Sequence, residues 1–103
     1  MDEFELELYK SMNLIGFKFE KDLEACDKMF VSKSNPKHII VNDFISHRLG
    51  FYFENEFKEQ FFFYGSKYDE RTFIEWLKNP IPKSRIELTA IRVKEYIDKN
   101  YKI

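Results

Sequence analysis

Apolar residues recur at helical spacing in the first part of the chain. They lie three or four residues apart, at Phe4, Leu8, Met12 and Ile15. Asp2 and Glu5 have the spacing of a capping box, and Gly16 is suited to end a helix in the left-handed conformation. These features predict a helix over about residues 3–14. The alternation of apolar residues around Leu6 leaves a strand as the competing interpretation.

Between residues 17 and 64 the hydrophobic period changes to two. The segment "GFKFEKD" alternates apolar and charged residues, and "KMFVSKS" and "KHIIV" are short runs rich in β-forming residues. Asn35 and Pro36 separate the last two runs as a turn. Because parallel neighbours need a long crossover and these connections are short, we expect an antiparallel meander of about four or five strands.

Four consecutive aromatic residues occupy positions 61–64, and a hairpin explains them as two interleaved faces. We predict that residues 49–54 pair with residues 58–64 through a loop at residues 55–57. The predicted cross-strand neighbours are Phe51 with Phe61, Leu49 with Phe63, Glu54 with Lys58, and Gly50 with Phe62. One face then enters the core, with Leu49, Phe51, Phe53, Phe61 and Phe63. The opposite face carries the aromatic residues Tyr52, Phe62 and Tyr64.

Two more helices are predicted after Gly65. Asp69 can cap a helix that runs to about residue 78, and the Pro-containing segment 79–82 ends it. Ser84 and Glu87 form a second capping box before a helix to about residue 100, with an apolar stripe at Ile86, Ala90, Val93 and Ile97. The expected architecture is one α+β domain over residues 1–103, in which an N-terminal helix and two C-terminal helices pack on the meander.

Composition narrows the class of protein. Aromatic residues make up 18% and charged residues 34% of the chain, a composition typical of a folded domain rather than a disordered segment. No apolar run approaches the roughly 20 residues that cross a bilayer, and the N-terminus is acidic where a signal peptide is basic and then apolar. With Cys26 as the single cysteine, we expect a cytoplasmic protein without a membrane anchor.

Catalytic motifs are weak in this sequence. The two histidines, His38 and His47, do not stand at metal-ligand spacing, and the isolated glycines make no phosphate loop. The nearest catalytic constellation, suited to a small hydrolase or nuclease, consists of Asp43, His47, Glu54 and Glu56. We expect no metal and no cofactor, and we rank an enzyme third among the functions.

Charge is distributed unevenly along the chain. Residues 1–30 carry eight acids and four bases, whereas residues 78–103 carry three acids and seven bases. Either the basic end binds phosphates, or the two ends lie together and neutralise each other. Three bases recur at seven-residue intervals on the last predicted helix, at Arg85, Arg92 and Lys99. With Tyr52, Phe62 and Tyr64 as stacking rings, they make a nucleic-acid-binding protein the second hypothesis.

The last predicted helix also carries apolar residues away from its core stripe. At 100° per residue, Leu88 and Ile91 lie roughly 160° and 140° from Ile86. Either a neighbouring helix covers them, or they form an interface. Our leading hypothesis is a small non-catalytic binding or regulatory protein that acts through protein–protein contacts, including self-association as a homodimer. The abundance of Lys, Ile, Asn, Phe and Tyr suggests an AT-rich genome and an accessory, phage or mobile-element product.

Overall fold

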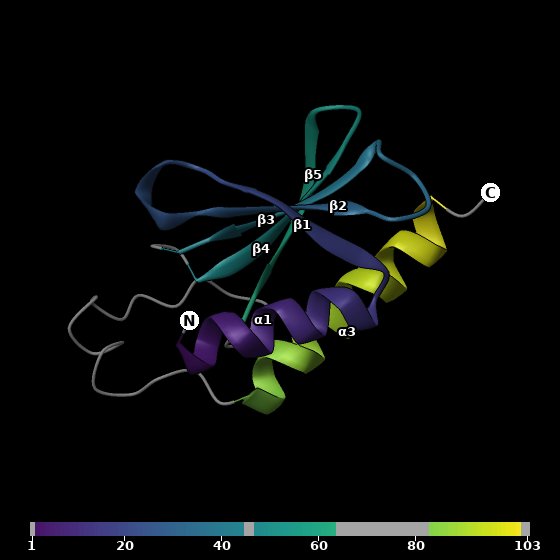
Figure 1. Ribbon diagram of the computed structural model, residues 1–103. Helices are drawn as coiled ribbons and strands as arrows, with labels where there is room; N and C mark the ends of the chain where they lie inside the picture. The colour runs from purple at the N-terminus through teal and green to yellow at the C-terminus, as the bar shows by residue number, and fades with distance from the viewer. Residues whose placement is uncertain (1, 45–46, 64–82, 102–103) are drawn as a thin grey trace.

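A layer of helices covers one face of an antiparallel sheet (Figure 1). The computed structural model describes residues 2–44, 47–63 and 83–101. The strands are β1 (Phe17–Asp22), β2 (Lys28–Ser32), β3 (His38–Asp43), β4 (Arg48–Phe53) and β5 (Glu56–Phe62). The helices of this part of the chain are α1 (Glu3–Leu14) and α3 (Lys83–Asn100), and η1 (Glu24–Cys26) is a short 3-10 turn. The helix predicted over residues 69–78 lies outside the described residues.

Helix α1 follows its predicted bounds and caps. The Asp2 side chain accepts a hydrogen bond of 2.8 Å from the backbone N–H of Glu5, which satisfies one of the free donors of the first turn. Leu8 and Met12 are fully buried on the inner side. Gly16 follows the helix with a φ of +85°, the left-handed conformation expected for it.

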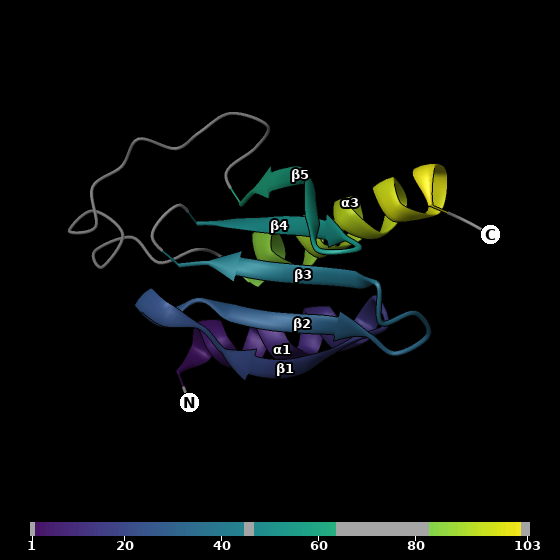
Figure 2. The ribbon, with the colours of Figure 1, turned by 90° about the horizontal axis from the view of Figure 1, so that it is seen from above.

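The sheet is a five-stranded meander, as predicted. Its strands are ordered β1-β2-β3-β4-β5 and every neighbouring pair is antiparallel. Figure 2 shows the strands side by side in chain order, with both helices behind them. The predicted turn between β2 and β3 is present, and Asn35 closes it by accepting a 3.0 Å hydrogen bond from the N–H of His38.

The predicted register of the β4–β5 hairpin is wrong by two residues. Leu49 pairs with Phe61 and Phe51 with Glu59, not Leu49 with Phe63 and Phe51 with Phe61. The reason is the turn, in which Glu54 and Asn55 both have positive φ, at 51° and 68°. Two left-handed residues make the tight two-residue turn that matches the twist of a hairpin, so the loop is shorter than predicted.

The faces of the hairpin are nevertheless as predicted, because a shift of two residues preserves the side of every side chain. The core contains Leu49, Phe51, Phe61 and Phe63, and Phe53 packs against it partly buried. An irregularity after Phe51 takes up one extra residue of β5. It separates the predicted partners Glu54 and Lys58, which pair instead with Lys37 and Glu56, respectively.

Gly50 has a different neighbour from the predicted Phe62. It lies opposite Gln60, and a Cβ at this position would come within 3.4 Å of the rings of Phe57 and Tyr52. The missing side chain thus gives room to Phe57 on the outer face of the sheet, the face turned away from the helices.

Helix α3 buries the predicted stripe. Ile86, Ala90, Val93 and Ile97 all belong to the core, which α3 shares with α1 and the inner face of the sheet. The helix begins at Lys83, so Ser84 is already helical and is not the predicted cap. In the part of the chain that the structure describes, no helix is long and apolar enough to cross a membrane.

Candidate functional site

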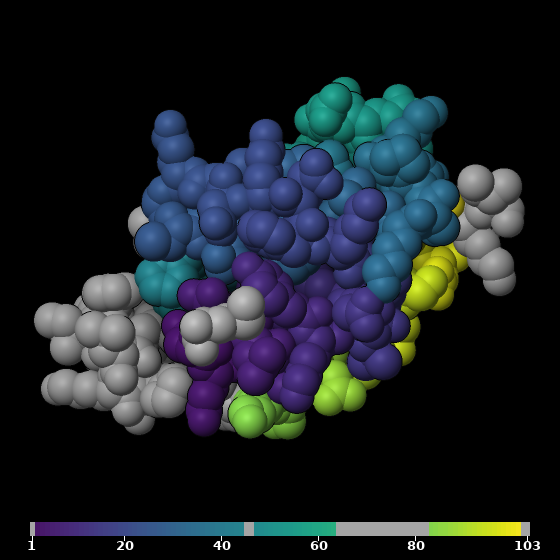
Figure 3. Space-filling view, viewed as in Figure 1, coloured from purple at the N-terminus to yellow at the C-terminus, as the bar shows by residue number. Residues whose placement is uncertain are grey.

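The helical layer leaves large apolar side chains in contact with solvent. On α3, Leu88 is 50% exposed and Ile91 is 36% exposed, so the described part of the chain leaves the two residues singled out in the sequence uncovered. Leu6 and Leu14 of α1 are also exposed. We call these four residues the outer helical surface. Figure 3 shows atoms of α1 and of the first turns of α3 next to one another below the strands.

Charge divides this surface between the two helices. The first turns of α1 carry Glu3, Glu5 and Glu7, whereas α3 has two more bases than acids. The five bases of α3 are Lys83, Arg85, Arg92, Lys94 and Lys99, and its three acids are Glu87, Glu95 and Asp98. The two helices pack together, yet no ion pair between described residues joins them. Between the described parts of the two helices, proximity is therefore not accompanied by direct charge pairing.

Arg85, Arg92 and Lys99 form the basic stripe of α3, and the middle residue of this stripe contacts the sheet. Arg92 donates a hydrogen bond of 3.4 Å to the backbone oxygen of Phe62, and its guanidinium lies 5.7 Å from the centre of the Phe61 ring. This arginine therefore ties α3 to β5. Arg85 and Lys99 are exposed. A phosphate backbone following the stripe would meet two free bases rather than three.

The predicted stacking residues are separated by burial. Tyr52 is half-buried on the outer face, where its ring lies 5.5 Å from that of Phe57. Phe62 is only 6% exposed, and Tyr64 lies outside the described residues. Because a base can stack only on a ring that solvent reaches, Tyr52 and Phe57 are the accessible rings of this face among the described residues.

The acidic constellation considered for catalysis is split between two ends of the sheet. Asp43 and His47 flank the start of β4, whereas Glu54 and Glu56 lie at the turn after its end. Five residue steps along a strand separate these ends by about 17 Å. Within the described residues, no three His, Cys, Asp or Glu side chains are grouped to hold a metal ion.

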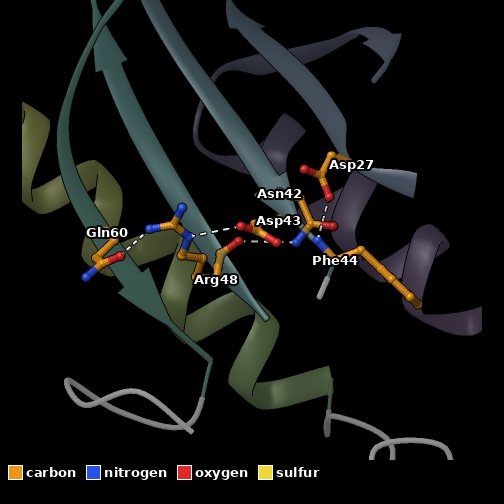
Figure 4. Close-up of polar contacts among 6 residues, drawn as sticks. All are labelled: Asp27, Asn42, Asp43, Phe44, Arg48 and Gln60. Carbon is orange, nitrogen blue, oxygen red and sulfur yellow. Dashed lines mark hydrogen bonds and ion pairs between the residues drawn. The ribbon is translucent and has the colours of Figure 1, made fainter. Parts of the chain in front are cut away.

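A polar network occupies the Asp43 end of the sheet (Figure 4). The Arg48 side chain donates to Asp43 Oδ2 at 3.3 Å on β3 and to Gln60 Oε1 on β5. Nearby, Asn42 Nδ2 donates to the backbone oxygen of Arg48. These contacts cross three strands, so the network ties β3, β4 and β5 together.

His38 is a buried residue that sequence reasoning did not assign to a site. Its side chain is 8% exposed, and its ring makes edge contacts with those of Phe51, Phe53 and Tyr101. Burial and the nearby charge of Lys94 hold the pKa of His38 below its ordinary value, because both disfavour the imidazolium form. The burial of His38 could have been predicted from its spacing to Ile40, because alternate residues of a strand share a face of the sheet.

No known protein family, curated protein or solved structure matches this chain.

Proposed function

We propose that this chain is a non-catalytic binding protein that acts through protein–protein contacts, and that its first partner is a second copy of itself. The observation that carries the proposal is the exposure of Leu88 and Ile91 on α3. Burying a large aliphatic side chain contributes about 1.5–3 kcal/mol. A surface with four such side chains therefore gains substantially from being covered.

Charge supports self-association over an unrelated partner. In a two-fold dimer, the same surface of both copies meets, and each residue contact occurs twice. If the helical layers pack face to face, the acidic α1 of one copy can oppose the basic α3 of the other. The outer helical surface is then complementary to itself, and charge sets the relative orientation of the copies.

The proposed setting is the cytoplasm, where the single cysteine Cys26 stays reduced and the dimer serves a regulatory role. An origin as an accessory or mobile-element product is part of the same proposal. The nucleic-acid hypothesis is the alternative, and it depends on Arg85 and Lys99, the two stripe residues that are exposed.

Light scattering coupled to size-exclusion chromatography tests the proposal. The wild-type chain is expected to elute as a dimer, and the double variant Leu88→Asp/Ile91→Asp as a folded monomer by circular dichroism. Phe57→Asp is the matched control, because Phe57 is 46% exposed but lies on the outer face of the sheet. A wild-type monomer at every concentration, or equal dissociation of the control, would refute self-association through the helical layer.

A nucleic-acid-binding assay on the same variants tests the alternative function. If the basic stripe is the working surface, wild-type protein binds nucleic acid with an affinity that falls steeply with salt, since phosphate contacts release counterions. Arg85→Glu/Lys99→Glu then abolishes this binding, whereas Leu88→Asp/Ile91→Asp leaves it intact.

A further inference from the structure

A pocket of about 490 Å³ lies between the start of α1, the β1–β2 connection and the end of β3. This volume falls within the range of small-molecule sites. Its apolar wall consists of three half-buried side chains, Phe4, Leu23 and Phe44. The polar part of the lining is made mainly of hydrogen-bond acceptors. It contains the carboxylates of Asp2, Glu5 and Asp22 and the amide of Asn42, together with Cys26 and Lys28.

Asn42 gives this pocket an unpaired acceptor. The residue is 2% exposed and lies on β3 between its cross-strand neighbours Lys28 of β2 and Leu49 of β4. Its Nδ2 donates to the backbone oxygen of Arg48 on the β4 side (Figure 4), so the oxygen of the same amide is directed toward β2 and the pocket. Among the described residues, this Oδ1 accepts no hydrogen bond, and it is not one of the unpaired atoms that neighbouring side chains close off from solvent. A hydrogen-bond donor in the pocket can therefore reach it.

The charge of the lining selects a cation. Lys28 Nζ is already paired with Asp22 at 2.6 Å, and the lining contains no further base to compensate Asp2 and Glu5. The hydrogen bond to Asp22 raises the pKa of Lys28 above its ordinary value, and the charge of Glu5 adds to this effect. The N–H of Glu5, which an anion at the start of α1 could bind, already donates to Asp2. A cation in the pocket is therefore stabilised, whereas an anion would face two uncompensated carboxylates.

The arrangement of the acceptors favours an organic cation over a metal ion. In the part of the chain that the structure describes, no three His, Cys, Asp or Glu side chains are grouped to hold a metal. We propose that this pocket binds a small organic molecule with a primary ammonium group. The ammonium donates to Asn42 Oδ1 and to the Glu5 carboxylate, and the second of these hydrogen bonds is strengthened by charge. The apolar part of the molecule packs against Phe4, Leu23 and Phe44.

Titration of the full-length protein with benzylamine at neutral pH, followed by NMR of the Asn42 side-chain amide, tests this assignment. Benzylamine is a cation under these conditions and is expected to shift the Asn42 amide signals until they saturate. Benzyl alcohol has nearly the same shape without the charge, and the ammonium ion has the charge without the apolar part. Each should bind weaker than benzylamine by about tenfold or more.

Two variants of the first turn of α1 separate contact in the pocket from general attraction. Glu5→Gln should weaken benzylamine binding about tenfold, the loss expected for one charge-assisted hydrogen bond. Glu3→Gln is the matched control, because it removes the same charge from an exposed residue outside the lining and should leave the affinity unchanged. Asn42→Leu should also weaken binding. Since Asn42 is buried, circular dichroism checks that this variant folds, and Glu5→Gln decides the test if it does not.

Three results would overturn the proposal. Equal binding of benzylamine and benzyl alcohol would show that charge does not select the ligand. Equal losses for Glu5→Gln and Glu3→Gln would show attraction by the acidic start of α1 rather than contact in the pocket. Benzylamine binding that leaves the Asn42 amide signals unchanged, or no binding at all, would show that this acceptor does not hold the ammonium group.

Discussion

Gly16→Ala is expected to destabilise the protein solely through its backbone. A Cβ built at Gly16 meets nothing within 4 Å, so no steric clash adds to the effect. The φ of +85° lies in the left-handed region, where a residue with a Cβ pays about 1–2 kcal/mol. Alanine also lowers the conformational entropy of the unfolded chain, and this effect offsets about 0.4–1 kcal/mol of the loss. The net loss should be about 1 kcal/mol, measured by urea unfolding followed with circular dichroism.

Asparagine and D-alanine provide matched controls at the same position. Asparagine tolerates the left-handed region, so Gly16→Asn should cost less than Gly16→Ala. D-Alanine, introduced by chemical synthesis, favours positive φ and should be at least as stable as glycine. The Gly16 backbone oxygen also accepts a 2.9 Å hydrogen bond from the N–H of Lys33, which all three variants retain. Equal losses for Ala and D-Ala would refute the conformational explanation and indicate crowding instead.

Three other perturbations test the core, the histidine and the first cap. Phe61→Ala should cost about 3–5 kcal/mol in urea unfolding and the exposed Phe57→Ala less than about 1, and a reversed order would contradict the faces of the hairpin. Because the pKa of His38 is lowered on folding, the unfolded chain binds more protons below about pH 6.5 and stability falls as the pH falls. His38→Gln should flatten this dependence between pH 7.5 and 5.5, and an unchanged slope would exclude His38 as its source. Asp2→Ala should lower the unfolding free energy by about 1 kcal/mol, and no change would show that the 2.8 Å cap is not formed in solution.

For the described helices and for the β4–β5 hairpin, the sequence predicted which side is buried better than it predicted which residues are neighbours. The helical period placed Leu8 and Val93 in the core, and the strand period did the same for Phe51 and Phe61. A register slip of two residues satisfies the same period, so burial alone could not reject it. The two-residue turn at Glu54 and Asn55 sets the register. Positive φ values in such turns are usually predicted from a glycine, and this turn contains none.

The candidate sites were predictable where they depend on one element and not where they depend on two. The position of Leu88 and Ile91 on α3 follows from helical geometry. The contact of Arg92 with Phe62 joins residues 30 positions apart, so no local pattern shows that this base is engaged. A pocket lined by His38 is likewise assembled from the end of α1, the β2–β3 turn and α3, whose proximity only the tertiary fold creates.

The two outermost strand pairs are the irregular ones. The pairing of β1 with β2 shifts between Phe19 and Lys21, and that of β4 with β5 shifts after Phe51, whereas the two inner pairs are regular. Bulges twist an edge away from the flat geometry that a further strand needs. Lys58 and Glu59 also place charges along β5. Growth of the sheet from molecule to molecule, the route to fibres, is thereby hindered at both edges.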